Sequence, residues 1–151
     1  MTLSRKRSQA GFTITEVVIA TLIIAILSSI AYSNYTEQVR KVRRGDAQAA
    51  LLSLANALER YKTNNVGTAT TGYNGAAVPA IHPDKAPLDG TRKFYDLSIV
   101  AADLSATTYT ITASPIASGP MHGDECGTFE LDHNGERSLS GASKTLEYCW
   151  R

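Results

Sequence analysis

Hydrophobic and polar positions divide the chain into three parts with different periods. The first part holds an uncharged run, VVIATLIIAILSSIAY, over residues 17–32, which residues 12–16 extend toward the N-terminus. At 1.5 Å per residue, a helix over 12–32 is about 31 Å long, enough to cross the hydrocarbon core of a bilayer. This part therefore predicts a transmembrane or filament-core helix over 12–33.

Apolar side chains continue at helical spacing beyond this run. They recur every three or four residues as Val39, Val42, Leu51, Leu54, Leu58 and Tyr61. Alanines in the same segment favour a helix, whereas the asparagine pair at 64–65 and Gly67 predict its end. We therefore expect one long N-terminal helix over 12–62, with an amphipathic half over 34–62 and its weakest point at Gly45.

The remaining residues show loop and strand signals. Residues 63–92, rich in Thr, Gly, Ala, Asn and Pro, predict a connecting loop, and 93–151 predict an antiparallel sheet. Alternating positions place strands near 94–100, 109–113, 127–132 and 137–139, and the hairpin signal Asn134-Gly135 joins the last two. A long helix followed by such a sheet predicts an α+β globular head over 63–151.

Composition and charge narrow the classes of function. The chain is 43% hydrophobic and 19% charged, so it is neither disordered nor fibrous. Its net charge of +1 gives no global argument for nucleic-acid binding. The basic cluster Arg40-Lys41-Arg43-Arg44 has no interleaved aromatic residues, so we expect a solvated helix face or contacts with acidic groups of neighbouring subunits. Nucleic acid is therefore not expected as a partner.

Physical arguments alone leave three interpretations of the N-terminal segment open. It is a signal peptide cut before Tyr32, an uncleaved anchor, or a segment cut between Gly11 and Phe12. Glu16 bears on this choice because a carboxylate inside an apolar helix costs roughly 2.5 kcal/mol or more and needs a partner. In a chain that begins at Phe12, Glu16 lies one turn from a new ammonium group, and it could neutralise the terminus of a neighbouring helix.

The segment KRSQAGFTITE over residues 6–16, followed by an aliphatic run, resembles the class III leader of type IV prepilins of the type IVa class. The resemblance implies that residues 1–11 form a leader peptide and that a prepilin peptidase cuts after Gly11. It also implies that the same enzyme methylates the new amine of Phe12. By the same resemblance, Glu16 is required for methylation and for docking a subunit into the filament.

The membrane segment departs from the family at two positions. Many type IV pilins have a helix-breaking Gly and Pro where this chain has Ala25 and Ser33. Proline costs about 3 kcal/mol inside a helix and favours local melting. We therefore expect a more continuous helix than in those relatives.

Cys126 and Cys149 are the only cysteines. Two thiols are too few for a structural zinc site, and in an exported domain a disulfide is expected, with two buried thiols as the alternative. In the chain-entropy model such a bond contributes about 3 kcal/mol. The pair also resembles the C-terminal disulfide-bounded loop of type IV pilins, which implies the pilin fold: a long N-terminal helix packed on an antiparallel sheet.

Short segments narrow the resemblance to PilE-type minor pilins. These segments are AQAALL at 47–52, ERY at 59–61, YTITA at 109–113, CGT at 126–128 and CW at 149–150. The resemblance implies a structural subunit of a type IV pilus, not an enzyme, that contributes to pilus assembly, with roles in adhesion or twitching motility. Its implied partners are major and minor pilins, the prepilin peptidase/methyltransferase and the inner-membrane assembly platform. Its implied location is the inner membrane, with a periplasmic head, and then the extracellular pilus (fimbrium).

Two other functions stay open. A pseudopilin of a type II secretion system shares the leader and the helix, but pseudopilin heads often use bound calcium in place of the C-terminal disulfide. The cysteine pair therefore favours the pilin. The other possibility is a secreted soluble domain released by signal peptidase before Tyr32.

No catalytic, cofactor or metal site is expected. The three histidines, His82, His122 and His133, lie in different predicted loops without the spacing of a helical zinc motif. The acidic residues Asp124 and Glu125 beside His122 are expected to be ordinary loop residues. No nucleotide-binding loop or nucleophile-elbow motif is present.

Overall fold

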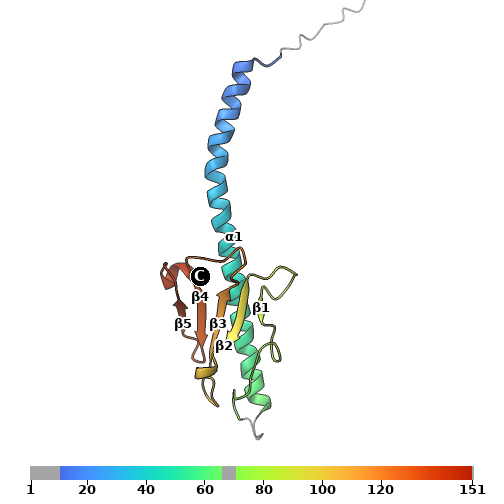
Figure 1. Ribbon diagram of the computed structural model, residues 1–151, viewed down its shortest axis with the longest axis vertical. Helices are drawn as coiled ribbons and strands as arrows, with labels where there is room; N and C mark the ends of the chain where they lie inside the picture. The colour runs from blue at the N-terminus through green and yellow to red at the C-terminus, as the bar shows by residue number, and fades with distance from the viewer. Residues whose placement is uncertain (1–10, 66–70, 151) are drawn as a thin grey trace, which may run out of the picture. The chain divides into compact units, whose positions relative to one another are not determined.

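The computed structural model describes residues 11–65 and 71–150. Its elements, in chain order, are α1 (Ile14–Asn64), β1 (Lys85–Ala86), β2 (Tyr95–Ile99), a 3₁₀ helix (Ala101–Asp103), β3 (Thr110–Pro115), β4 (Thr128–Asp132), β5 (Arg137–Ser140) and α2 (Leu146–Cys149) (Figure 1). The chain divides into two compact units, residues 1–39 and 40–151. Of the expected leader, only Gly11 lies within the described residues.

Helix α1 is continuous from Ile14 to Asn64. It passes through Ala25, where many relatives have glycine, and through Gly45, which the sequence marked as its weakest point. Glycine inside a helix costs only about 1 kcal/mol relative to alanine. Ala47 and side chains one turn from Gly45 are buried in the core. Their burial stabilises this part of the helix, so the helix does not break at Gly45.

The apolar part of α1 is exposed over its whole circumference. Large side chains from Ile14 to Ile30 are each more than half exposed, and Phe12 is 88% exposed. A helix that is apolar on all sides must find lipid or other helices. Its length and composition are sufficient to cross a membrane.

The five strands form one antiparallel sheet in the order β1-β2-β3-β4-β5. The hairpin predicted at Asn134-Gly135 joins β4 to β5, and Gly135 has a positive φ of 80°. The Asp132 carboxylate accepts the backbone N–H groups of Asn134 and Glu136 and so closes the turn. Although partial burial raises the pKa of Asp132, these N–H groups outweigh it and lower that pKa.

Three short elements were not predicted. The connecting loop contains β1, whose two residues pair with Asp96 and Tyr95 of β2. The other two are the 3₁₀ helix and α2. Elements of two to four residues are too short to show a period of hydrophobic positions, so the sequence gives no signal for them.

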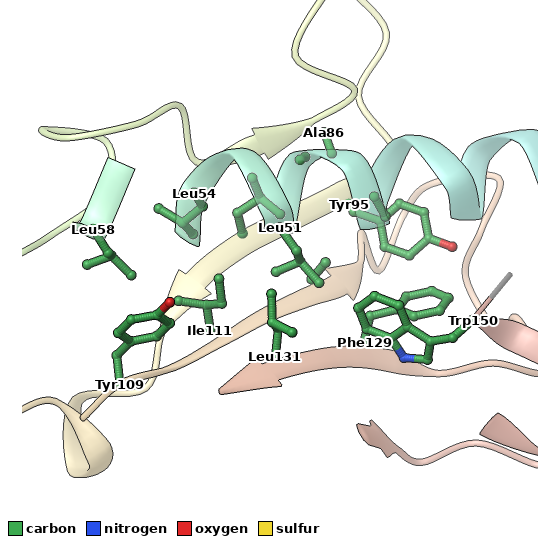
Figure 2. Packing of buried hydrophobic residues seen from close by; sticks show 14 of the residues in the cluster. Leu51, Leu54, Leu58, Ala86, Tyr95, Tyr109, Ile111, Phe129, Leu131 and Trp150 are labelled. Atoms are coloured by element: carbon green, nitrogen blue, oxygen red, sulfur yellow. The ribbon is translucent and has the colours of Figure 1, made fainter. Parts of the chain in front are cut away.

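The core lies between the sheet and the C-terminal half of α1. Alternate strand residues point toward the helix and are buried: Tyr95, Leu97, Ile111, Ala113, Phe129 and Leu131. They contact a stripe of α1 that includes Leu51, Leu54 and Leu58 (Figure 2). Burying each of these leucines contributes about 1.5–3 kcal/mol. The predicted fold class, an α+β head with a long helix on an antiparallel sheet, is confirmed.

The other face of the sheet is polar. Hydroxyl side chains bond across neighbouring strands, as Ser98 does with Thr112 at 2.7 Å and Thr128 with Ser114 at 3.2 Å. Ser138 donates to the Glu130 carboxylate at 3.0 Å. This face therefore presents hydroxyl and carboxylate groups that already have partners.

Candidate functional site

The expected cleavage point is accessible in the structure. Gly11 and Phe12 are exposed, and a Cβ placed on Gly11 would meet no atom within 4 Å. A peptidase could therefore approach the bond between them without displacing other parts of the described chain.

Glu16 lies at the start of α1 and is held there by Thr13. The Glu16 carboxylate accepts the backbone N–H of Thr13 at 2.9 Å and its hydroxyl at 2.8 Å. In return, the backbone N–H of Glu16 donates to the Thr13 hydroxyl at 3.3 Å. This is a capping box, which satisfies N–H groups at the helix start and places a negative charge at the positive end of the helix dipole.

From the sequence we expected a partner for Glu16 on another subunit, and the contact with Thr13 was not predicted. The spacing Thr13-x-x-Glu16 is itself the capping-box signature, so this contact could have been predicted. Within one chain, then, the carboxylate has two hydrogen-bond donors. These bonds hold the carboxylate at the N-terminal end of the helix, where it could pair with an ammonium group.

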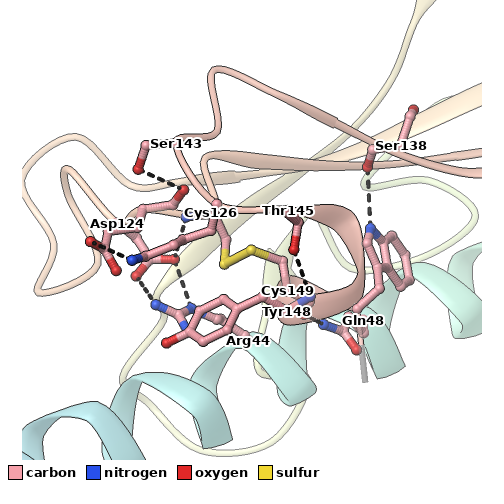
Figure 3. The surroundings of a disulfide bond; sticks show 12 residues. Arg44, Gln48, Asp124, Cys126, Ser138, Ser143, Thr145, Tyr148 and Cys149 are labelled. Carbon is pink, nitrogen blue, oxygen red and sulfur yellow. Dashed lines mark hydrogen bonds and ion pairs between the residues drawn. A yellow bond between two sulfur atoms is a disulfide. The ribbon is translucent and has the colours of Figure 1, made fainter.

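Cys126 and Cys149 form the expected disulfide. The bond joins the segment before β4 to α2, with 5.7 Å between the two Cα atoms, and both cysteines are buried (Figure 3). It closes a loop that contains β4, β5 and the turn between them. The predicted C-terminal disulfide-bounded loop is therefore confirmed.

A buried ion pair connects α1 to this loop. Arg44 donates from Nε and Nη2 to the two carboxylate oxygens of Asp124 at 2.9 and 2.7 Å (Figure 3). The two side chains are only 4% and 0% exposed. The expectation that Arg44 belongs to a solvated basic face is therefore wrong, and Asp124 is not an ordinary loop residue. Helical spacing carried the missing signal, because Arg44 lies on the same face as the buried Gln48 and Leu51.

Three further contacts surround this pair. Gln48, one turn along α1, donates to the backbone carbonyl of Cys149 at 2.6 Å. The Tyr148 ring lies 5.6 Å from the Arg44 guanidinium, and the indole N–H of Trp150 donates to the Ser138 carbonyl. We call Arg44, Gln48, Asp124 and the disulfide the C-terminal cluster. It fastens α1 to both ends of the disulfide-bounded loop.

Tyr95 of β2 interacts electrostatically with Asp124 of the C-terminal cluster. Its side chain is fully buried, and its hydroxyl has no hydrogen-bond partner among the described residues. Burial raises the pKa of Tyr95, and the Asp124 carboxylate adds to the effect. The tyrosine therefore stays neutral and acts as a packing residue.

Two groups of surface cations within residues 40–151 lie close together in the sequence. Arg40, Lys41 and Arg43 lie on α1, and the Arg43 guanidinium is 4.4 Å from the centroid of the Phe94 ring. In the loop 87–93, Lys93 donates to the carbonyls of Pro87 and Leu88, and Arg92 is exposed. Within residues 11–65 and 71–150, none of these five cations forms an ion pair.

The histidines do not converge on a site. His82 is buried, and its ring nitrogens bond the Ser53 hydroxyl and the Pro83 carbonyl. His122 and His133 are exposed. In the part of the chain that the structure describes, no three His, Cys, Asp or Glu side chains are placed to hold a metal ion.

Two family descriptions match the sequence. Residues 33–130 match the family described as "Type IV minor pilin ComP, DNA uptake sequence receptor". Residues 6–32 match the prokaryotic N-terminal methylation motif. The first match covers most of the head and the second covers the expected cleavage point.

Curated relatives and solved structures are also similar. The type II secretion system core protein G of Aeromonas hydrophila is 36% identical over 67 residues, which are 44% of this chain and 47% of that protein. The core protein G of Klebsiella michiganensis is 31% identical over 91 residues, 57% of this chain and 64% of that protein. This chain thus spans roughly half to two thirds of the length of these relatives. The crystal structure of the non-core minor pilin PilV of Neisseria meningitidis matches with a TM-score of 0.50 at 20% identity, over 72% of this chain and 93% of that one.

Proposed function

Because the chain belongs to the family of type IV minor pilins described as ComP, we propose that it is a minor subunit of a type IV pilus. The match over residues 33–130 carries the proposal. The methylation motif over 6–32 and the exposed apolar part of α1 support it. The protein acts by assembling with other subunits and not by catalysis.

The proposed assembly uses three residues at the N-terminal end. The prepilin inserts in the inner membrane with its head in the periplasm, and the prepilin peptidase cuts after Gly11 and methylates Phe12. On the assembly platform, Glu16 pairs with the terminus of a neighbouring major or minor pilin. The apolar helices then pack together, so that burial between helices replaces contact with lipid in the extracellular pilus.

The subunit's abundance in pili tests the assignment as a minor pilin. In pili sheared from the native host, this chain is expected at a molar ratio well below that of the principal subunit. Cells that lack the gene should still make the principal subunit in normal amounts. Quantitative mass spectrometry of sheared pili measures both, and an equimolar amount would identify a major pilin instead.

A pseudopilin of a type II secretion system is the second candidate. It is favoured by the curated relatives, which are secretion core proteins with 31–36% identity over part of the chain. The disulfide between Cys126 and Cys149 favours the pilin. Loss of protein secretion in a deletion strain that keeps normal pili would support the pseudopilin.

We further propose that the head binds DNA, as the description of its family states for that family. The net charge of +1, one of the two grounds for the opposite expectation, averages over local surfaces; the other ground, the lack of interleaved aromatic residues, concerned only the cluster Arg40-Lys41-Arg43-Arg44. The outer sheet face is unsuitable because it carries Asp96 and Glu130. The loop 87–93 is suitable because Arg92 is exposed there without an ion pair, and Lys93 stabilises the loop through two backbone carbonyls. An exposed guanidinium of this kind can contact DNA phosphates.

The variant Arg92→Ala tests this loop. We expect weaker binding of duplex DNA across sequences and a slope of log K against log salt that is smaller by about 1, because one phosphate contact is lost. Fluorescence anisotropy with the full mature chain in detergent measures both quantities. The control is Arg137→Ala. Arg137 is the first residue of β5, its guanidinium lies over the Trp150 ring, and it is outside the residues 33–130 that match the family. Unchanged binding, or an equal loss in both variants, would contradict the assignment.

A further inference from the structure

Three cations follow the membrane segment closely in the sequence. Arg40, Lys41 and Arg43 come within eleven residues of Tyr32, the last residue of the uncharged run. Arg44, the fourth member of the basic cluster, is buried and forms an ion pair with Asp124. In the proposed topology these cations lie on the exported side, where the positive-inside rule disfavours them. Neither assembly through Glu16 nor DNA binding by the loop 87–93 explains their presence.

The surroundings of these cations combine charge with apolar surface. Arg40 and Lys41 are exposed, and the Arg43 guanidinium stacks on Phe94. Val42 lies between them and is 66% exposed. Tyr35, which follows the uncharged run in the sequence, is 68% exposed.

Acidic residues near these cations on α1 leave them available. Arg40 and Lys41 form no ion pair within residues 11–65 and 71–150, and Asp46, further along the helix, is half-buried. Cations that follow a tyrosine in the sequence and flank an exposed aliphatic side chain are typical of segments that lie at a membrane–water interface.

We propose that Arg40, Lys41 and Arg43 bind the phosphate headgroups of anionic lipids in the periplasmic leaflet and hold this end of the head at the membrane before assembly. The inference rests on the proposed membrane insertion of α1. Because the three cations follow the uncharged run within eleven residues of chain, insertion of that run keeps them close to a dense layer of phosphates, whereas DNA has no such fixed proximity. Each cation near an anionic surface strengthens the association by about fivefold. A subunit that leaves the membrane must break these contacts.

Acylation of Lys41 tests the proposal in the full mature chain. The chain is reconstituted in phosphatidylcholine vesicles with and without phosphatidylglycerol, and a membrane-impermeant amine reagent labels the lysines. We expect the anionic lipid to slow labelling of the Lys41 amine by about fivefold or more, and high salt to restore the rate. Lys144, in the disulfide-bounded loop, serves as the internal control and should react equally in both vesicles.

A double variant separates lipid binding from other causes. With Arg40→Gln and Arg43→Gln together, Lys41 should react in anionic vesicles nearly as fast as in neutral ones, whereas Arg60→Gln at the far end of α1 should keep the lipid effect. Equal Lys41 rates in both vesicle types for the wild-type chain would overturn the proposal. So would protection of Lys41 by added duplex DNA but not by phosphatidylglycerol, which would make the cluster a DNA contact.

Vesicle flotation distinguishes this failure from failure of the proposed function. A chain that floats with both vesicle types but shows no lipid effect overturns only the headgroup contact. A chain that floats with neither overturns the membrane insertion as well.

Discussion

A Glu16→Ala chain is expected to reach the inner membrane at wild-type levels and to be absent from pili. The change leaves the apolar run intact, so insertion into the bilayer is not impaired. It removes the one carboxylate near the N-terminus of α1, and with it the charge that would neutralise a neighbour's terminal ammonium. Without that pair, an ammonium buried among apolar helices costs several kcal/mol, which is enough to reduce incorporation by about a hundredfold or more. Immunoblots of membranes and sheared pili measure the two amounts.

The capping box allows a sharper comparison. Glu16→Gln keeps the size of the side chain and can still accept hydrogen bonds from Thr13, but it lacks the charge. It should fail to enter pili almost as completely as Glu16→Ala if charge pairing drives docking. The control Glu147→Ala, at an exposed carboxylate of α2, should be incorporated normally. Normal incorporation of Glu16→Ala would contradict the docking role.

Arg44→Ala is expected to cause a large loss of stability. It leaves the Asp124 carboxylate buried without its guanidinium partner, and breaking a buried pair in this way costs about 3–5 kcal/mol. It also loosens the attachment of α1 to the disulfide-bounded loop. Urea unfolding of the full mature chain in detergent, followed by Trp150 fluorescence, measures the free energy of unfolding.

Two further variants identify the cause. Arg60→Ala removes an exposed arginine of the same helix and should change the free energy of unfolding by less than about 0.5 kcal/mol. Combining Arg44→Met with Asp124→Leu removes both charges and should recover much of the stability lost in Arg44→Ala. A double variant no more stable than Arg44→Ala would show that packing, and not the unpaired charge, dominates.

The local pattern predicted the regular elements. The three-and-four spacing of Leu51, Leu54 and Leu58 gave the buried face of α1, and Asn134-Gly135 gave the hairpin. Both signals are local, because each depends on the positions of residues within one or two turns of chain. The two-residue β1 was missed because it forms only where the connecting loop passes the edge of β2.

The pairing of Arg44 with Asp124 could not be predicted, for a different reason. Arg44 and Asp124 are 80 residues apart, and a run of four cations reads as a solvated surface. Helical spacing places Arg44 on the buried face of α1, but only the tertiary fold brings Asp124 to it. The disulfide could be predicted because the sequence contains no cysteine other than Cys126 and Cys149.

The mass of the mature protein from its native host tests the central claim most directly. We predict a chain that begins at Phe12, carries one methyl group on its amine and retains the disulfide. Intact-mass measurement with N-terminal fragmentation determines all three. A chain that begins at Tyr32 would be a secreted domain without the apolar helix, and it would contradict the proposed processing, the role of Glu16 and assembly into a pilus.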